Sequence, residues 1–343
     1  MSYSRLYHLS PFFQGPDGLA VSNLPDVQPA PDQYLIAVHA AAANFFDILQ
    51  IQGKYQNQPP FPWVAGAEFA GVVLATPTGS QLVKPRFAVG DRVFGASQGA
   101  YATKVCATES QLCPVPTGWS FSEAAGLFVT APTSYAALVI RANIRAGDYV
   151  LVHAAAGGVG LAAVQVAKAF GATVIATAGT ARKLAVAQAF GADHVIDYKA
   201  EANWPDAVRK LTPNGRGVDI VFDPVGLVDR STKCTAWNGR ILIVGFAAGK
   251  IEAVAMNKVL LKNISLVGIH WGAYTRNEPD QIPAVWEGLR WLIDRGAFRP
   301  TVFTDGEPFV GLDHVPATLK ALGGRETWGK VVVEIPQEAE SKL

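Results

Sequence analysis

Apolar residues in the middle of the chain follow first a strand pattern and then a helix pattern. Residues 149–154 form a short apolar run rich in β-forming side chains, which predicts a buried strand. After a glycine-containing turn, apolar residues recur at helical spacing on one face: Val159, Ala162, Ala163, Val166 and Phe170. The pattern therefore predicts a strand, a tight turn and a helix in direct succession.

Five more strands are predicted downstream, separated by segments of helical composition or periodicity. The predicted strands are 173–178, 194–197, 218–223, 240–245 and 265–270, and the helical segments are about 181–190, 201–212, 228–236 and 256–262. Six strands that alternate with helices specify a doubly wound parallel sheet. The predicted fold class is therefore α/β, and a ligand of such a sheet lies beyond the carboxyl ends of its strands.

The first third of the chain has a different pattern. Short β-like runs, many prolines and glycines and little helical periodicity characterise residues 1–123, which predicts a small barrel or sandwich domain. A helical segment at 124–141, broken near Pro132, leads from this domain into the sheet domain. The sheet domain is predicted to span residues 124–272.

The last seventy residues change pattern again. A helix is predicted at 282–295, with Val285, Leu289 and Leu292 on one face, and a final strand at 329–335. A tail that ends in a strand most economically returns to the first domain. We therefore predict that residues 273–343 complete the domain formed by residues 1–123.

The turn at 155–160 has the composition of a phosphate-binding loop. Ala155, Gly157 and Gly160 occupy the three places of a G-x-G-x-x-G turn, with alanine in the first. Gly157 would let the backbone approach a pyrophosphate, and Gly160 would let the helix pack close to the strand. The helix N-terminus would present free N–H groups to the anion. The alternative is a glycine loop in some other α/β domain.

Composition excludes several classes of protein. The chain has 343 residues, of which 50% are hydrophobic and 17% charged, so it is globular and long enough for about two domains. A net charge of +1 gives no long-range attraction for nucleic acid or an anionic membrane. Three cysteines cannot form a disulfide framework, and the first residues lack the order of a signal peptide. We therefore expect a cytoplasmic protein that binds neither nucleic acid nor membrane.

Several separate motifs, in order, carry a resemblance to a known family. They are Asn44-Phe-Phe-Asp47, Gly53-Lys-Tyr55, Gly66-Ala-Glu68-Phe-Ala-Gly71, Gly90-Asp-Arg-Val93, His153-Ala-Ala-Ala-Gly-Gly-Val-Gly160, Gly179-Thr-Ala-Arg-Lys183, Val195-Ile-Asp-Tyr198 and Gly324-Arg325-Glu-Thr-Trp-Gly-Lys330. Over nearly its whole length the chain resembles the medium-chain dehydrogenase/reductase superfamily, and within it the zinc-free quinone oxidoreductases related to zeta-crystallin. The resemblance implies a GroES-like β-barrel domain, a Rossmann domain, and a C-terminal return to the barrel.

The residues that would bind zinc are absent from the sequence. Zinc members carry a histidine just before the glutamate of the Gly-x-Glu motif, where this chain has Ala67. They also carry four clustered cysteines, whereas only Cys106 and Cys113 lie in the neighbouring region. A catalytic zinc needs about three protein ligands and a structural zinc about four. We therefore expect no metal, and we interpret the two cysteines as small core residues.

The choice between NADH and NADPH is decided at the end of the second strand of the predicted parallel sheet, residues 173–178. An acidic side chain there would accept hydrogen bonds from the ribose hydroxyls and repel a 2′-phosphate. Here the position is Gly179, followed closely by Arg182 and Lys183. An uncharged position with basic neighbours favours NADPH. The alternative is that Arg182 and Lys183 belong to the solvated face of the next helix.

The resemblance also implies individual cofactor contacts. The residues that match contacts to the 2′-phosphate are Gly179, Lys183, Tyr198 and Arg325, and Thr133 matches a threonine that bonds the carboxamide. The nicotinamide position is matched by Gly245 and Phe246. The pyrophosphate turn is matched by Ala155, Gly157, Gly158, Val159 and Gly160.

The resemblance implies hydride transfer from the nicotinamide to an acceptor. For this step the protein must orient the nicotinamide ring and polarise the acceptor oxygen. Without a metal, neutral donors must do this, and the resemblance implies Asn44 and Tyr55. The alternative for these two residues is an asparagine turn and a packed tyrosine, while Asp47 is expected to brace the loop. Relatives often carry another tyrosine between them, where this chain has residues 48–51, Ile-Leu-Gln-Ile. The acceptor pocket is therefore expected to be apolar and to suit a flat conjugated molecule.

The leading hypothesis is NADPH-dependent, metal-independent reduction of a small quinone, with hydride passing from nicotinamide C4 in a cleft between the two domains. One alternative keeps the cofactor and reduces the carbon–carbon double bond of an enal, enone or enoyl thioester. An alternative of another class is a cofactor-binding protein with little turnover and a structural or nucleic-acid role. The resemblance also implies a homodimer, formed through the edge strand at 265–270.

Overall fold

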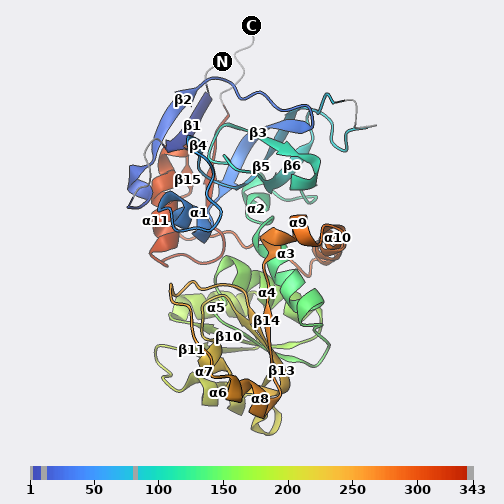
Figure 1. Cartoon of the computed structure of the whole chain (residues 1–343), viewed down its shortest axis with the longest axis vertical. Helices are drawn as coiled ribbons and strands as arrows, with labels where there is room; N and C mark the ends of the chain where they lie inside the picture. The colour runs from blue at the N-terminus through green and yellow to red at the C-terminus, as the bar shows by residue number, and fades with distance from the viewer. Residues whose placement is uncertain (1–2, 9–13, 80–83, 338–343) are drawn as a thin grey trace. The chain divides into compact units, whose positions relative to one another are not determined.

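A computed structural model describes residues 3–8, 14–79 and 84–337. The chain divides into two compact units (Figure 1). Unit 1 contains residues 1–129 and 302–343, and unit 2 contains residues 130–301. No helix in the described ranges is both long and apolar enough to cross a membrane.

Unit 2 is built on a six-stranded, wholly parallel sheet. Its strands lie in the order β11, β10, β9, β12, β13, β14. Their bounds are β9 Tyr149–Val152, β10 Thr173–Ala178, β11 His194–Asp197, β12 Val218–Asp223, β13 Thr235–Ile243 and β14 Ser265–Gly268. The strand order reverses at β9, which makes the carboxyl end of β9 the expected ligand-binding position. The predicted α/β fold class is confirmed.

Helices connect successive strands of this sheet. They are α4 Gly158–Ala169, α5 Ala181–Ala189, α6 Trp204–Lys210, α7 Val228–Ser231 and α8 Met256–Lys262. The core beneath the helices of one face includes Leu151, Ile175, Val221 and Ile241 from four adjacent strands, with Trp204 packed among them. The predicted helix at 228–236 is only one turn long, because the chain enters β13 at Thr235, earlier than predicted.

The segment between the two units departs from the prediction. α2 (Phe121–Ala125) ends at Gly126, and α3 (Thr130–Tyr135) continues through Pro132 into a π-helical stretch, Ala136–Arg141. The break therefore lies at 126–129 and not near Pro132. Proline is tolerated in the first turn of a helix, where its missing N–H has no helical partner to lose.

Residues 273–301 form part of unit 2. This segment holds α9 (Tyr274–Asn277) and α10 (Gln281–Asp294), and α10 packs on α3. The predicted apolar face of α10 is confirmed, since Val285, Leu289 and Leu292 are its buried residues. Unit 2 is thus larger than the predicted sheet domain of residues 124–272, because this amphipathic helix buries its apolar face against α3.

Unit 1 consists of two β-sheets and a few short helices. A seven-stranded sheet has the order β15, β16, β3, β5, β6, β8, with β7 also paired to β3, and a three-stranded sheet has the order β2, β1, β4. Their bounds are β1 Tyr3–His8, β2 Ala20–Leu24, β3 Gln33–Ala42, β4 Trp63–Val64, β5 Glu68–Ala75, β6 Arg92–Ala96, β7 Lys104–Thr108, β8 Leu112–Pro114, β15 Phe309–Val310 and β16 Val332–Glu334. The helices α1 (Phe45–Ile51) and α11 (Val315–Gly323) pack against each other.

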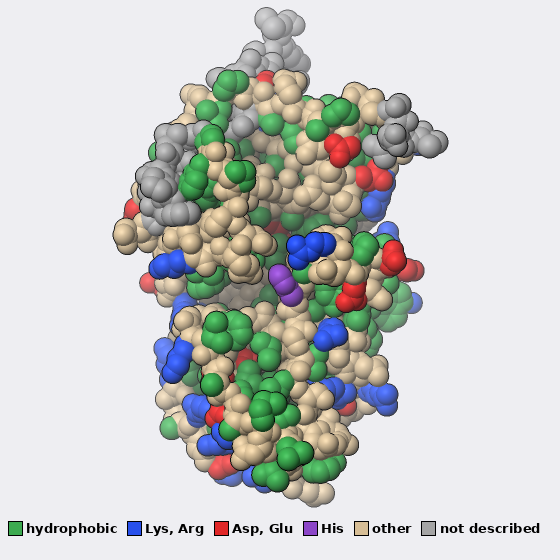
Figure 2. Space-filling model, viewed as in Figure 1, with side chains coloured by type: hydrophobic (Ala, Val, Ile, Leu, Met, Phe, Trp, Pro, Cys, Tyr) green, Lys and Arg blue, Asp and Glu red, His purple; other side chains and the backbone are tan. Residues whose placement is uncertain are grey.

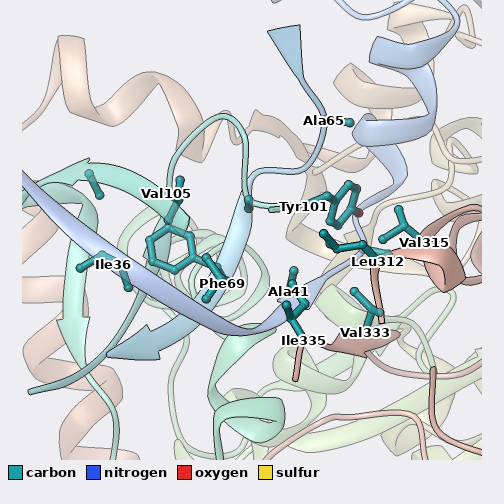
Figure 3. Close-up of a cluster of buried hydrophobic side chains, with 14 of the residues drawn as sticks. Ile36, Ala41, Ala65, Phe69, Tyr101, Val105, Leu312, Val315, Val333 and Ile335 are labelled. Carbon is teal, nitrogen blue, oxygen red and sulfur yellow. The ribbon is translucent and has the colours of Figure 1, made fainter. Parts of the chain in front are cut away.

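The chain's last strand lies beside one of its first. β16 is antiparallel to β3, with Val332 opposite Ala42. Side chains from distant segments therefore share one core, as Figure 3 shows for Ile36, Phe69, Tyr101 and Val333. This pairing also carries the segment just before β16, including Lys330, to the start of α1.

Candidate functional site

The predicted phosphate-binding turn lies at the carboxyl end of β9, and its backbone is tightly constrained. Ala154 adopts a left-handed conformation, with φ of 46°, and the Ala155 N–H donates to the carbonyl oxygen of Thr177 in β10 at 3.0 Å. A Cβ added to Gly160 would lie 2.3 Å from the Ala154 carbonyl oxygen. Only glycine fits at position 160, so the turn closes directly against the first turn of α4.

The start of α4 presents its backbone N–H groups beyond the end of β9. Gly157 is the N-cap, and Gly158, Val159 and Gly160 are the first helical residues. The N–H groups of a first helical turn have no partner within the helix, and they favour an anion. These N–H groups could therefore hold the predicted pyrophosphate.

Ser134 connects α3 to this turn. Its hydroxyl lies 2.8 Å from the carbonyl oxygen of Val159 and 3.1 Å from that of Thr130. The predicted carboxamide contact, Thr133, is the preceding residue of α3. Sequence reasoning missed Ser134, although it follows directly after a residue that the resemblance singled out.

His153, in the motif before the turn, has a structural role. Its Nδ1 lies 2.9 Å from Thr177 Oγ1 and its Nε2 lies 2.9 Å from Ser231 Oγ. The ring is 1% exposed and meets Trp204 edge to face. Burial lowers the pKa of His153 to about 4, so the ring is neutral at physiological pH. The neutral imidazole links β9, β10 and α7 beneath the turn.

At the carboxyl end of β10 there is no acidic side chain. Gly179 follows the strand, and Thr180 caps α5 by accepting a hydrogen bond from the Lys183 N–H at 3.3 Å. A Cβ on Gly179 would lie 2.7 Å from Tyr198 Oη and 3.0 Å from Lys199 Cε. The position predicted to select the cofactor is therefore bordered by a phenol and a lysine from the end of β11.

The predicted nicotinamide position lies at the carboxyl ends of β12 and β13. Asp223 is fully buried, and its carboxylate accepts hydrogen bonds from the N–H groups of Val225 at 2.8 Å, Gly226 at 2.9 Å and Leu227 at 2.6 Å. The Ala247 N–H then donates to the Pro224 carbonyl oxygen at 3.0 Å. Asp223 thereby shapes the loop that holds the segment after β13, which contains Gly245 and Phe246. Sequence reasoning missed Asp223, for which the available signal was an acid at a strand's carboxyl end.

Unit 2 thus brings most of the predicted cofactor residues to one edge of its sheet. The turn residues 155–160, Gly179, Lys183, Tyr198, Gly245 and Phe246 follow the carboxyl ends of β9, β10, β11 and β13. Two predicted residues do not follow a strand of this sheet. Thr133 lies in α3, and Arg325 belongs to unit 1, where it follows α11 in a left-handed conformation with φ of 58°.

Asn44, the first predicted acceptor-side residue, is engaged at both ends of its amide. Its Nδ2 donates to Glu68 Oε2 at 3.0 Å and lies 3.4 Å from the Ala42 carbonyl oxygen. Its Oδ1 accepts from Lys330 Nζ at 2.7 Å. The side chain is only 6% exposed. Among its polar contacts, the contact to Ala42 is the longest, so its N–H is the one most easily redirected.

Lys330 and Glu68 form a buried ion pair behind this asparagine. Lys330 Nζ lies 2.8 Å from Glu68 Oε2, with the side chains 4% and 0% exposed, respectively. Lys330 also donates to the Ala43 carbonyl oxygen at 3.0 Å, and Glu68 Oε1 accepts from the Val129 N–H at 2.8 Å. Every charged group of the pair is hydrogen-bonded, as burial requires. The pair therefore fixes the rotamer of Asn44.

Asp47 completes this cluster but carries an incompletely satisfied carboxyl. Oδ2 accepts from the Asn44 N–H and from Tyr101 Oη, both at 2.8 Å, whereas the buried Oδ1 has no hydrogen-bond partner. Burial raises the pKa of Asp47 to about 7, against the opposing effects of these two hydrogen bonds and of the Lys330 charge. Asp47 braces the start of α1 through the Asn44 N–H, in line with the expected role, and its carboxyl also has a pKa near neutrality.

Tyr55, the second predicted acceptor-side residue, is half-buried and stacks on Phe46 with ring centroids 5.4 Å apart. Burial, followed by the charge of Asp47, raises the pKa of Tyr55. The phenol therefore keeps its proton at neutral pH and can act as a neutral hydrogen-bond donor.

The described side chains do not fit a zinc site. Within the described ranges, no three His, Cys, Asp or Glu side chains converge. Glu68 follows Ala67, where zinc members have histidine, and its carboxylate is occupied by Lys330, Asn44 and the Val129 N–H.

Comparison with known families agrees with this geometry. Residues 30–142 match the model described as an alcohol dehydrogenase GroES-like domain, and residues 158–289 match the model described as a zinc-binding dehydrogenase. The chain is 38% identical over 317 residues to a quinone oxidoreductase-like protein 2 homolog of Nematostella vectensis, which covers 89% of this chain and 82% of that protein. It is 32% identical over 288 residues to the quinone oxidoreductase of Homo sapiens, covering 82% and 85%.

The chain is also similar to a solved structure of Escherichia coli quinone oxidoreductase complexed with NADPH, with a TM-score of 0.84 and 28% sequence identity. The match covers 96% of this chain and 99% of that one. The matched family models and the relatives above 30% identity together show the family. This chain belongs to the medium-chain dehydrogenase/reductase superfamily, in its zinc-free quinone oxidoreductase branch.

The buried ion pair yields a first prediction. Replacing Lys330 by methionine should lower the free energy of unfolding by about 3–5 kcal/mol, because Glu68 would be left buried without its partner. The double variant Lys330→Met/Glu68→Leu should be more stable than Lys330→Met, since neither charge remains. Urea unfolding of the two variants and the natural protein measures these differences.

The matched control is Lys320→Met, which breaks the exposed ion pair between Lys320 and Asp17. Exposed pairs contribute about 0–1 kcal/mol, so this variant should remain close to the natural protein. If the Lys320 and Lys330 variants lost the same stability, the structural role assigned to the buried pair would be wrong.

Asp47 yields a pH-dependent prediction. Its pKa is about 7 in the folded protein against an ordinary 3.8, so between these values the folded protein holds a proton that the unfolded chain has released. Its contribution to stability is therefore complete below about pH 4 and is lost as the pH rises towards 7. Relative to Asp47→Asn, the natural protein should lose roughly 1.4 kcal/mol per pH unit in this window.

Unfolding curves of both proteins between pH 4 and 8 measure this effect, with the exposed Asp17→Asn as the control. Parallel pH profiles for the natural protein and Asp47→Asn would show that Asp47 is ionised in the folded protein throughout.

Proposed function

We propose that this protein is an NADPH-dependent, metal-independent quinone reductase. The observation that carries the proposal is the carboxyl end of β10, where Gly179 replaces an acidic residue and lies against Tyr198 and Lys199, with Lys183 in the first turn of α5. An extra phosphate would be attracted to this position, whereas an acid would repel it. The quinone oxidoreductase relatives, one of them solved with NADPH, support both the cofactor and the acceptor class.

The residues of unit 2 would hold and orient the cofactor. The backbone N–H groups of residues 158–160 bind the pyrophosphate, and the absence of a side chain at Gly157 lets it approach. Lys183 and Tyr198 would bind the 2′-phosphate, and the resemblance assigns Arg325, a residue of unit 1, to the same group. Thr133 binds the carboxamide, beside the segment of Gly245 and Phe246. NADPH supplies the hydride.

Tyr55 is the leading donor to the acceptor oxygen. Its raised pKa keeps the phenol protonated, so it can stabilise negative charge as that charge develops on the oxygen. Asn44 is the second donor, through the N–H that lies 3.4 Å from the Ala42 carbonyl oxygen. The Lys330–Glu68 pair positions this amide but need not contact the acceptor.

A homodimer and a cytoplasmic location also belong to this proposal. β14 is an edge strand of the sheet in unit 2, and the neighbouring α8 exposes Met256, Leu260 and Leu261 at 67–77%. Figure 2 shows hydrophobic side chains gathered over this region of unit 2. Contiguous exposed apolar side chains of this kind mark interaction surfaces, and a second copy of β14 would extend the sheet across a two-fold axis.

The test of function is a titration with NADPH and NADH followed by an acceptor panel. We expect tighter binding of NADPH, and faster turnover of 1,4-benzoquinone and 9,10-phenanthrenequinone than of a 2-alkenal. Tyr55→Phe should lower kcat with quinone about 10- to 100-fold, because a hydrogen bond to a charged group contributes roughly 1.5–3 kcal/mol. Tyr149→Phe, at the amino end of β9, is the control and should leave kcat unchanged.

Faster reduction of the alkenal would replace the quinone hypothesis with reduction of a conjugated double bond. NADPH binding without reduction of any acceptor would favour a cofactor-binding protein with little turnover. An unchanged kcat in Tyr55→Phe would contradict the role given to that phenol.

The dimer is tested by sedimentation velocity. The natural protein should sediment at twice the chain mass of 36.4 kDa, and Leu260→Glu/Leu261→Glu should sediment as a monomer, because charge would be buried in the interface. Val89→Glu, at an exposed apolar position of unit 1, should remain dimeric. A single 36.4 kDa species for the natural protein would rule the dimer out.

A further inference from the structure

We infer that Lys199 is a further specificity-determining residue, which binds the 2′-phosphate of NADPH together with Lys183. The inference rests on the proposed function, because it concerns the same cofactor position. The family resemblance does not include Lys199, which lies 20 positions after Gly179 in the sequence and follows a different strand.

The end of the Lys199 side chain reaches the position that selects the cofactor. Its Cε lies 3.0 Å from the point where a Cβ on Gly179 would stand, and Nζ is bonded to Cε. The ammonium group is therefore held one bond away from an atom that borders Gly179 at the end of β10. Tyr198 Oη lies 2.7 Å from the same point, so the phenol and the lysine border Gly179 together.

The backbone around Lys199 is fixed in a way that maintains this placement. β10 and β11 are in parallel register with Ala178 opposite Asp197, and the Tyr198 N–H donates to the Ala178 carbonyl oxygen at 3.2 Å. Asp197 Oδ1 accepts from the Lys199 N–H at 2.8 Å and from the Ala200 N–H at 3.4 Å. The turn after β11 is therefore tied to the end of β10.

The charges at this edge favour an anion. Arg182 and Lys183 lie in the first turn of α5, which contains no acidic residue. Lys199 adds a third cation from the turn after β11. The acids nearest to Lys199 in sequence are Asp197 and Glu201, each two positions away. Asp197 Oδ1 accepts from the Lys199 N–H, and Glu201 Oε1 accepts from the Asn203 N–H at 3.0 Å. A phosphate monoester carries about −1.5 to −2 charges at neutral pH, so two lysines can each make a charge-assisted hydrogen bond to it.

This arrangement has a specific consequence for cofactor choice. NADH has a ribose hydroxyl where NADPH has the phosphate, so it offers Lys199 no negative charge at that position. Loss of Lys199 should therefore weaken NADPH and leave NADH nearly unaffected. A lysine that merely belonged to the solvated surface would affect neither cofactor.

The experiment measures dissociation constants by isothermal titration calorimetry for NADPH, NADH and 2′,5′-ADP. The proteins are the natural chain, Lys183→Ala, Lys199→Ala and, as the control, Lys210→Ala, an exposed lysine at the end of α6. We expect Lys199→Ala to raise the Kd of NADPH and of 2′,5′-ADP about tenfold and to change that of NADH less than twofold. Lys199→Arg should retain most of the affinity, and Lys210→Ala should change none of the three constants.

Three results would overturn the inference. They are an unchanged NADPH affinity in Lys199→Ala, an equal loss for NADPH and NADH, and an equal loss in Lys210→Ala. If Lys183→Ala alone discriminates between the cofactors, the proposed function stands and only the role of Lys199 fails. If the natural protein binds NADH as tightly as NADPH and does not bind 2′,5′-ADP, the proposed function itself fails.

Discussion

The close approach of the 154–160 turn to helix α4 is the constraint on which the cofactor edge of unit 2 depends. The Ala154 carbonyl oxygen occupies the space that any side chain at position 160 would need. This contact sets where α4 begins, and therefore where its N–H groups are presented. His153, buried and neutral, supports the turn from below through Thr177 and Ser231. The turn is therefore supported by a buried, hydrogen-bonded histidine.

The corresponding constraint in unit 1 is the burial of the charged groups of Lys330 and Glu68. Lys330 and Glu68 are almost inaccessible to water, and their mutual attraction offsets the cost of desolvation only because further hydrogen bonds satisfy them. Asp47 has no cation of its own in the cluster, which explains why burial raises its pKa. Asn44 lies between these groups, and its orientation is a consequence of their electrostatics.

The two predicted acceptor-side residues consequently differ in character. Tyr55 is half-buried on the ring of Phe46 and keeps a phenol hydrogen available for donation. The amide of Asn44 is engaged by Lys330 and Glu68, so it can donate to an acceptor only through the N–H that makes the long contact to the Ala42 carbonyl oxygen. The resemblance named both residues as equals, because a motif records residue types and not the partners those residues acquire.

The sequence by itself determined the features that depend on neighbouring residues. The strands of the parallel sheet, the glycine turn at 155–160, the uncharged position at Gly179 and the apolar face of α10 all follow from local periodicity and side-chain size. Tertiary structure decided the features that join distant segments. Lys330 meets Asn44 across 286 positions and Glu68 across 262, and no local pattern records such a contact. The pKa of Asp47 and the reach of Lys199 towards Gly179 depend likewise on burial and strand register, which exist only once the chain has folded.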